Sequence, residues 1–163
     1  MALRPDLIEC WVFRVPEPGR VEYLLIRRAP GRIFAGLWQC VTGGVEPGER
    51  IPETALREVR EETGLEPAAL LGFYDLDMAY EFYDEGPDAM VVAAAFAVRV
   101  APDAAIALSH EHDASRWAGR EEALGLAIWP AYAEAIDRVE RRLLDPAVAA
   151  WFELSPEGRR LAR

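Results

Sequence analysis

The sequence predicts a single layered domain that combines β-strands with helices, of the α/β or α+β class. Three observations support this expectation. The chain has 163 residues, 52% of them hydrophobic, which suits one domain with a proper core. Short apolar runs bounded by turn signals recur along the chain and are typical of strands. One short acidic helix is expected near the middle, and a longer amphipathic helix near the end.

Three strands are expected before the central helix. Residues 7–15 form an apolar run that ends at the turn signal PEPGR, and residues 21–28 are its expected hairpin partner. Residues 29–36, APGRIFAG, are expected to form a loop because glycine and proline interrupt them. Residues 37–43 are interpreted as a short strand that leads into the central helix.

The central helix is expected between Pro52 and Gly64. Proline suits the first helical turn because its missing N–H is not needed there, and glycine suits the left-handed residue after the last turn. Arg50 and Ile51 stand where a serine or threonine cap would be favoured, so the signal for the N-terminal cap is weak. The predicted buried face consists of Ala55, Leu56, Val59 and Thr63.

Strands and loops are expected to alternate after the central helix. Strand-like residues begin near Ala69, and residues 81–89, EFYDEGPDA, are expected to form a polar loop. Residues 90–100 are a continuous apolar run rich in valine and alanine, which favours a buried strand. Residues 111–119 are expected to contain a short strand or turn.

The last part of the chain is expected to be mostly helical. A brief helix is predicted within residues 119–125, and a long amphipathic helix over residues 128–144, before Pro146. The domain is expected to span residues 1–154, and residues 155–163 are interpreted as a C-terminal tail. The buried stripe of the long helix is predicted to be Ile128, Tyr132, Ala135, Ile136, Val139 and Leu143.

Charge and cysteine content narrow the function and the compartment. The formal net charge is −10, which argues against an extended nucleic acid or an anionic membrane as partner, since both favour a basic surface. A small phosphorylated substrate remains open, provided that metal ions neutralise its phosphates. Cys10 and Cys40 are the only cysteines, and we recognise no signal peptide and no apolar run of the ~18–20 residues that a membrane helix needs. A cytoplasmic protein is therefore expected.

Three glutamates of the central helix break the local electrostatic rules. Glu58, Glu61 and Glu62 stand at i, i+3 and i+4 and share a face. Like charges at those spacings cost roughly 0.2–0.5 kcal/mol per pair, and the last turn of a helix disfavours anions. Such a cluster indicates a site, because carboxylate oxygens are the ligands that hard divalent cations prefer, Mg²⁺ above all. The alternative is a solvated acidic helix.

Residues 43–65 resemble the Nudix box, G-x5-E-x7-R-E-U-x-E-E-x-G-U, where U is an apolar residue. With about 7% for each fixed residue, a chance match at one starting point is on the order of 10⁻⁹. The resemblance implies the Nudix fold, an α/β/α sandwich with a mixed β-sheet and a loop–helix–loop metal site. The matching positions are Gly43, Glu49, Arg57, Glu58, Val59, Glu61, Glu62, Gly64 and Leu65.

The resemblance assigns roles to these residues. The backbone carbonyl of Thr42 or Gly43 is expected to serve as a metal ligand beside the glutamates. Arg57 and Glu49 are expected to brace the loop against the helix, although by spacing alone Arg57 could also pair with Glu61 at i+4. The implied metal-binding residues are Gly43, Glu58, Glu61 and Glu62.

A second segment, SHEHDASRW, resembles the E-H-x4-W segment that many Nudix proteins carry after the central strands. Glu111 is expected to supply a further metal-bound carboxylate or the general base that takes a proton from water, and the alternative is a capping or solvated glutamate. His112 is interpreted as structural. The predicted catalytic set is Glu49, Arg57, Glu61 and Glu111.

Substrate contacts are predicted outside the box. Arg27 or its neighbour Arg28 would bind a terminal phosphate, although strand alternation puts the two on opposite faces. Trp38 is either a wall of the cleft or a packing residue, and the adjacent Gln39 is a candidate for a hydrogen bond to substrate. Phe82 is expected on the polar loop, where it would stack on a nucleobase or anchor the loop.

The sequence therefore predicts a Mg²⁺-dependent pyrophosphohydrolase, with Mn²⁺ as a substitute, that cleaves a nucleoside diphosphate linked to another group. Residues 38–49 also resemble the branch described as dATP or dihydroneopterin triphosphate pyrophosphohydrolases, which implies a small nucleotide or pterin triphosphate as substrate. The alternatives are an RNA 5′-end pyrophosphohydrolase and a nucleotide sensor without catalysis. A homodimer is expected, since family members are often dimers.

Overall fold

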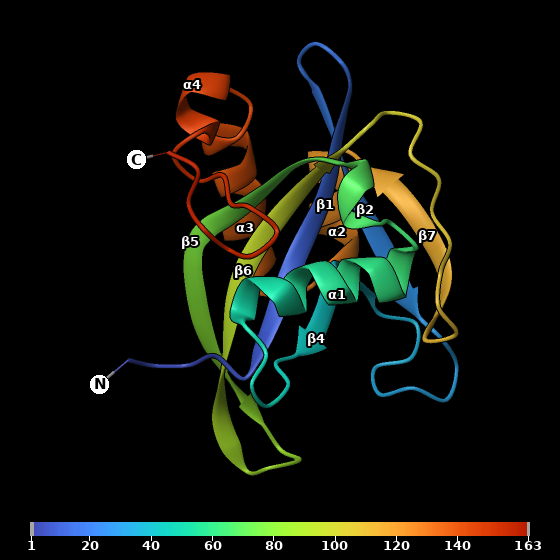
Figure 1. Ribbon diagram of the computed structural model, residues 1–163. Coiled ribbons are helices and arrows are strands. Elements are labelled where there is room, and N and C mark those ends of the chain that lie inside the picture. The colour runs from blue at the N-terminus through green and yellow to red at the C-terminus, as the bar shows by residue number, and fades with distance from the viewer. Residues whose placement is uncertain (1, 163) are drawn as a thin grey trace.

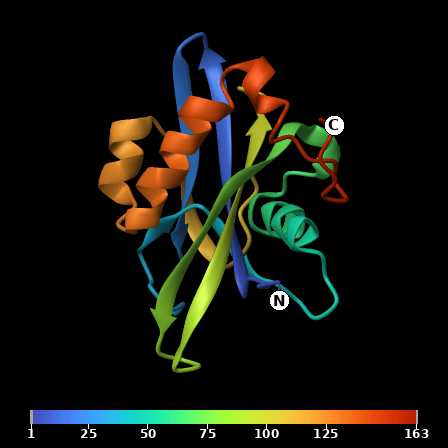
Figure 2. The ribbon, with the colours of Figure 1, turned by 90° about the vertical axis from the view of Figure 1, so that its left-hand side faces the viewer.

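A seven-stranded mixed sheet lies at the centre of the part of the chain that the computed structural model describes, residues 2–162. Helices cover both of its faces (Figures 1 and 2). The strands are β1 (Leu7–Glu17), β2 (Arg20–Arg28), β3 (Trp38–Gln39), β4 (Val41–Gly44), β5 (Leu70–Asp84), β6 (Ala89–Val100) and β7 (His112–Ala118). The helices are α1 (Ile51–Thr63), the short 3-10 helix η1 (Pro67–Ala69), α2 (Arg120–Leu126), α3 (Pro130–Arg142) and α4 (Pro146–Ala149).

The order of the strands places β1 at the centre of the sheet. The path runs β3-β2-β1-β6-β5, with β4 also paired to β1 and β7 also paired to β2. β1 and β6 are parallel, with Leu7 beside Ala93, whereas the other pairs are antiparallel. The short segment that contains β3 and β4 pairs with two strands, since β3 pairs with β2 and β4 pairs with β1. This segment brings the loop before α1 to the middle of the sheet.

Alternation along β1 divides the interior into two cores. Ile8, Cys10 and Val12 pack with the apolar residues of α1 on one face. Trp11 and Phe13 pack with residues of α2 and α3 on the other. Figure 2 shows α1 on one side of the sheet and α2 and α3 on the other. The predicted α/β/α sandwich with a mixed sheet is therefore confirmed.

One polar side chain is buried with the second core. Glu9 is fully buried, and its carboxylate accepts hydrogen bonds from the Trp11 indole at 3.1 Å and the Tyr80 hydroxyl at 2.6 Å. Burial raises the pKa of Glu9, and the two hydrogen bonds partly oppose this shift. Both carboxylate oxygens thus have a donor inside the protein.

Helix α1 has the predicted extent and the predicted end. It begins at Ile51 and ends at Thr63, and Gly64 adopts the left-handed conformation with φ 73°. The Arg50 side chain does not accept a hydrogen bond from the first turn of the helix. Instead, the Glu53 carboxylate accepts a hydrogen bond from the Arg50 backbone N–H at 3.4 Å. The predicted buried residues are all buried, and the structure adds two polar ones to them, Thr54 and Glu62.

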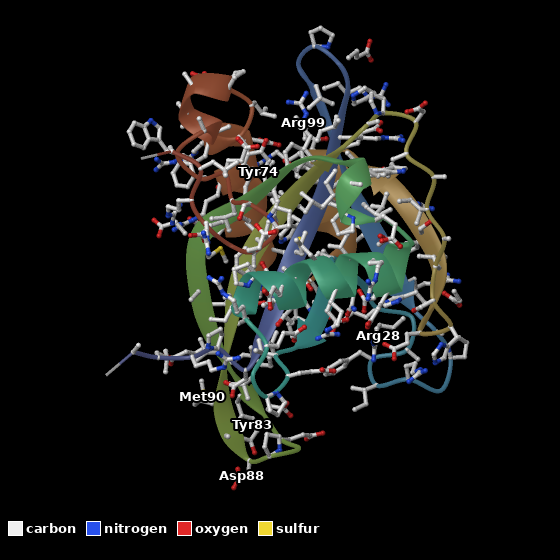
Figure 3. The ribbon with its side chains drawn as sticks, viewed as in Figure 1. Arg28, Tyr74, Tyr83, Asp88, Met90 and Arg99 are labelled. Atoms are coloured by element: carbon white, nitrogen blue, oxygen red, sulfur yellow. The ribbon has the colours of Figure 1, made fainter. Side chains whose placement is uncertain are left out.

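The prediction of a polar loop over residues 81–89 is wrong. β5 continues to Asp84 and β6 begins at Ala89, so Phe82 lies in a strand. This hairpin extends below the sheet in Figure 1, and Figure 3 marks its tip at Tyr83, Asp88 and Met90. Polar residues are tolerated there because much of the ribbon faces solvent, so polarity did not indicate a loop.

The C-terminal third differs from prediction at its boundaries. The predicted helix of residues 128–144 is α3, from Pro130 to Arg142, and Ile128 lies before it with 66% of its surface exposed, so its assignment to the buried stripe is wrong. Residues 119–125 do hold a brief helix, α2, and residues 111–119 hold β7.

The last described residues fold back along β5 towards α1. Isolated bridges join Tyr74 to Glu153 and Leu154 to Arg160. A Cβ atom on Gly158 would lie 2.5 Å from the Pro52 ring, so this segment touches the first turn of α1. The division into a domain of residues 1–154 and a tail of residues 155–163 remains a prediction, with residue 163 outside the described part. Within residues 2–162, no helix is long and apolar enough to cross a bilayer.

Candidate active site

The last turns of α1 face the end of β4, and two of the three helix glutamates meet it there. Glu62 is only 4% exposed, and its carboxylate accepts a hydrogen bond from the Thr42 backbone N–H at 3.3 Å. A Cβ atom on Gly43 would lie 2.0 Å from the Glu58 carboxyl carbon. A side chain at this position would displace the Glu58 carboxylate from its place against β4, so glycine preserves the position of that carboxylate.

Glu61 occupies a different environment from its two neighbours. Its side chain is 50% exposed, whereas that of Glu58 is 13% exposed. Glu61 has one ionic contact, with Arg57 at 3.3 Å. The exposed Glu61 carboxylate is free to reach an incoming ion or water, while the half-buried Glu58 and the buried Glu62 are held against β4.

Arg57 ties the loop to the helix. Its guanidinium donates two hydrogen bonds to Glu49, at 2.8 and 3.1 Å, and one to the Gly44 carbonyl at 3.0 Å. It also contacts Glu58 at 2.5 Å and, more distantly, Glu61. Both partners considered from the sequence are therefore present, and the bidentate contact with Glu49 is the closer one. Hydrogen bonding from Arg57 lowers the pKa of Glu49 to about 2.

Electrostatics disfavour charge on both Glu58 and Glu62. Burial, followed by the negative charge of Glu58, raises the pKa of Glu62 to about 8. Burial also raises the pKa of Glu58, although Arg57 partly opposes this shift. A bound cation would reverse both effects, because it stabilises the ionised carboxylates.

The donor set suits a hard divalent cation. It contains carboxylates and the backbone carbonyls at the end of β4, and no sulfur or imidazole. In residues 2–162, no three Asp, Glu, His or Cys side chains converge closely enough to enclose an ion by themselves. Mg²⁺ does not require this, since it usually keeps several waters and binds through one or two carboxylates. The residues present therefore fit such an ion.

Glu111 lies close enough to these glutamates for its charge to act on them. Its negative charge contributes to the raised pKa of both Glu58 and Glu62. Its carboxylate lies 3.6 Å from a guanidinium nitrogen of Arg28 and 3.6 Å from one of Arg32. Sequence reasoning missed Arg32, because an arginine in a glycine-rich loop carries no periodic signal.

Arg28, and not Arg27, points to the glutamates. Its positive charge lowers the pKa of Glu62, and it lies beside the C-terminal half of α1 (Figure 3). Arg27 instead forms an ion pair with Asp113 at 2.7 Å. The alternation recognised in the sequence separates the two arginines, and the structure shows which of them faces the helix.

The other three predicted substrate residues lie in different places. Trp38 is half-buried and packs against the core on the α2–α3 face, with the Arg27 guanidinium 5.7 Å from its ring centre. Phe82 lies in the hairpin, with its ring 6.2 Å from that of Tyr80. Gln39 is 7% exposed, and its side-chain amide contacts His112 and Thr42 inside the protein. That position favours an internal role for Gln39 over direct contact with substrate.

Residues 10–139 match the NUDIX domain family. The chain belongs to the Nudix family. Its domain is that of a hydrolase acting on phosphorus anhydrides, and Nudix hydrolases generally use divalent metal ions. The family predicted from the box is therefore confirmed.

Two relatives illustrate how far the likeness extends. Over 96 residues the chain is 43% identical to the octanoyltransferase of Myxococcus xanthus, a match that covers 58% of this chain and 25% of that protein. Over 107 residues it is 36% identical to the asymmetrical bis(5′-nucleosyl)-tetraphosphatase of Rattus norvegicus, covering 66% of this chain and 70% of that enzyme. The chain thus spans only a quarter of the first relative's length.

Solved structures agree with the sheet and helix arrangement. The dihydroneopterin triphosphate pyrophosphohydrolase of E. coli is 26% identical, with a TM-score of 0.70 over 83% of this chain and 94% of that one. The Ap4A hydrolase of C. elegans is 21% identical, with a TM-score of 0.69 over 85% of this chain and 96% of that one, a likeness of fold alone.

Proposed function

We propose that this protein is a Mg²⁺-dependent pyrophosphohydrolase that cleaves the pyrophosphate linkage of a small nucleoside or pterin triphosphate. The observation that carries the proposal is the pair of the half-buried Glu58 and the buried Glu62 against β4. Their burial and mutual repulsion disfavour ionisation, and a divalent cation is the partner that relieves both. Gly43 leaves the space that this pair requires.

Glu58, Glu62 and the more exposed Glu61 would hold the ion, together with a backbone carbonyl of Thr42 or Gly43. When bound, it would neutralise phosphate oxygens and polarise the phosphorus towards attack by water. Mn²⁺ would serve as a substitute. Arg57 and Glu49 would keep the loop in register with the helix, because their bidentate contact spans the two.

Glu111 would take the proton from the attacking water or hold a further ion. Two observations support either role: the charge of Glu111 acts on Glu58 and Glu62, and 38% of its side chain is exposed. Arg28 would bind a phosphate of the substrate, since its guanidinium is 3.6 Å from Glu111 and faces the same glutamates. Arg27, Trp38 and Phe82 remain candidate contacts for the rest of the substrate.

The substrate class follows from two supporting likenesses. The relative from rat is named for a dinucleoside tetraphosphate, and the E. coli structure for a pterin triphosphate. Both carry a polyphosphate on an aromatic heterocycle, and the run of residues 38–49 resembles the pterin and dATP branch. We further propose a homodimer in the cytoplasm, where Cys10 and Cys40, both buried and free, would stay reduced.

The test is hydrolysis of a substrate panel by the purified full chain, with and without Mg²⁺. The panel contains nucleoside triphosphates, dihydroneopterin triphosphate, diadenosine tetraphosphate and 5′-triphosphate RNA. Glu61→Gln should abolish most turnover, and Glu66→Gln, an exposed glutamate just after the same helix, is the matched control. Preference for the RNA would favour the alternative substrate, and tight binding of a nucleotide without turnover would favour a sensor. No cleavage of any member would refute the proposal.

A further inference from the structure

Gln39 and His112 meet inside the protein although they come from different strands. Gln39 lies on β3 opposite Ile26, and His112 begins β7 opposite Arg28. The Gln39 amide nitrogen is 3.3 Å from Nε2 of the His112 imidazole. Both side chains are buried, at 7% and 4% exposure, so solvent does not compete for this hydrogen bond.

Hydrogen bonds connect both Gln39 and His112 to Glu62. On one side the Gln39 amide donates to the Thr42 hydroxyl at 3.4 Å, and the Thr42 backbone N–H donates to the Glu62 carboxylate at 3.3 Å. On the other side the His112 backbone N–H donates to the Ser109 carbonyl at 3.2 Å, and the Ser109 backbone N–H donates to the Glu62 carbonyl at 3.4 Å. The Gln39–His112 contact closes this chain of bonds around the buried glutamate.

The imidazole is held there at an energetic cost. Nδ1 of His112 is buried without a hydrogen-bond partner among the described residues. A buried polar atom without a partner is unfavourable, and an apolar side chain of similar size would avoid that cost. Packing alone therefore does not account for a histidine here, whereas the bond at Nε2 does.

We propose that Gln39 and His112 are positioning residues that hold the β3–β4 segment and the segment before β7 at the spacing required by the site. Through Thr42 they orient the Glu62 carboxylate, and through the backbone next to His112 they keep Glu111 beside it. Neither side chain touches substrate. This inference rests on the proposed function, because it concerns the geometry of the same glutamates.

Two replacements of His112 separate the hydrogen bond from the volume of the ring. A glutamine at 112 can place its side-chain carbonyl oxygen near the position of Nε2, where it accepts from the Gln39 amide, whereas the side chain of an asparagine reaches only to the position of Nδ1. His112→Gln should therefore keep the contact with Gln39, and His112→Asn should lose it. Gln39→Leu removes the contact from the other side, and His110→Asn, at an exposed histidine, is the control for the same change nearby.

The first measurement is Mn²⁺ binding to the metal-free full chain, followed by electron paramagnetic resonance. The second is kcat and KM with Mg²⁺ on the preferred substrate. Gln39→Leu and His112→Asn should weaken Mn²⁺ binding and lower kcat by about 10–100-fold, the range for groups behind metal ligands, with little change in KM. His112→Gln and His110→Asn should resemble the wild type.

The double variant Gln39→Leu, His112→Asn sharpens the test. If the two residues act through one bond, the double variant should lose as much Mn²⁺ binding and kcat as either single variant does. Additive losses, or equal effects of His112→Gln and His112→Asn, would overturn the proposal. A wild-type protein that cleaves no substrate would refute the proposed function, while Mn²⁺ binding by the variants would still decide the role of Gln39 and His112.

Discussion

Two buried glutamates lie on opposite faces of the sheet and differ in how well the protein provides hydrogen-bond donors for their carboxylates. Glu9 accepts one bond on each oxygen, from Trp11 and Tyr80. Glu62 accepts a single backbone N–H at 3.3 Å and has Glu58 and Glu111 as negative neighbours. Burial raises the pKa of both carboxyl groups. Two side-chain hydrogen bonds oppose this shift at Glu9, whereas the negative charges of Glu58 and Glu111 add to it at Glu62. Burial alone therefore does not identify a site, and the partners of the carboxylate do.

The largest difference between Glu62 and Glu9 is expected in the rate of hydrolysis after each glutamate is replaced by glutamine. Glu62→Gln should lower the rate of hydrolysis by more than about 100-fold, beyond the 10–100-fold loss seen for groups behind a metal ligand. Glu9→Gln should change it little, because the amide fits the same space and lies on the other face. Steady-state kinetics with Mg²⁺ on the preferred substrate measure both. Comparable losses in the two variants would remove the distinction.

Stability should show the opposite order. Glu9→Leu leaves the Trp11 N–H and the Tyr80 hydroxyl without their acceptor, at about 1–3 kcal/mol each, so the free energy of unfolding should fall by roughly 2–6 kcal/mol. A pKa of about 8 keeps the Glu62 carboxyl mostly protonated at pH 7 in the folded, metal-free protein. Glu62→Gln removes the cost of that protonation and should leave the metal-free protein as stable as the wild type, or more so. Urea unfolding at pH 7 in the presence of a chelator gives both values. A strongly destabilised Glu62→Gln would contradict this order.

The pH dependence of stability should identify Glu62 directly. Its folded pKa of about 8 lies above the usual 4.5, so in the metal-free protein its contribution is fully present below pH 4.5 and is lost as the pH rises towards 8. The slope should be at most about 1.4 kcal/mol per pH unit over this window. Glu62→Gln should reduce the slope, and saturating Mg²⁺ should do the same in the wild type. The contribution of Glu9 to the slope should remain in both cases. Unfolding curves from pH 5 to 8 provide the comparison.

The smallest effect is expected at the brace of the loop. Arg57→Lys keeps the positive charge near Glu58 but cannot form the bidentate contact with Glu49 at 2.8 and 3.1 Å. Activity should fall by about 10-fold, at the low end for groups behind metal ligands. Arg60→Lys, one turn along the same helix and exposed, is the control. An unchanged rate for Arg57→Lys would mean that charge alone braces the loop.

Local signals in the sequence were sufficient for the central helix and its glutamates. Pro52 and Gly64 set its ends because they act on the backbone of one turn each. Spacing also placed Glu58, Glu61 and Glu62 near one another, since helical geometry fixes it. The box then supplied the partner positions Glu49 and Arg57, and the observed contacts agree with the expected brace.

Contacts between distant strands could not be predicted in the same way. The burial of Gln39 depends on where β3 enters between β1 and β2, and its neighbours in sequence do not reveal that. The hairpin of β5 and β6 was hidden because its residues are polar on a two-stranded ribbon with much exposed surface. For the arginines, alternation revealed that Arg27 and Arg28 diverge, but the direction of each depended on the position of α1.

The parallel pairing of β1 with β6 has a consequence for biosynthesis. The pairing of β1 with β6 cannot form until Ala93, the partner of Leu7, has been synthesised. Helix α1 is synthesised between the two strands. At about 5–20 residues per second, the nascent first half spends several seconds on the ribosome without the strand that completes its core. Its apolar surfaces are then uncovered, and Glu111 is not yet part of the chain. The catalytic centre is therefore assembled late, once more than half of the chain has been translated.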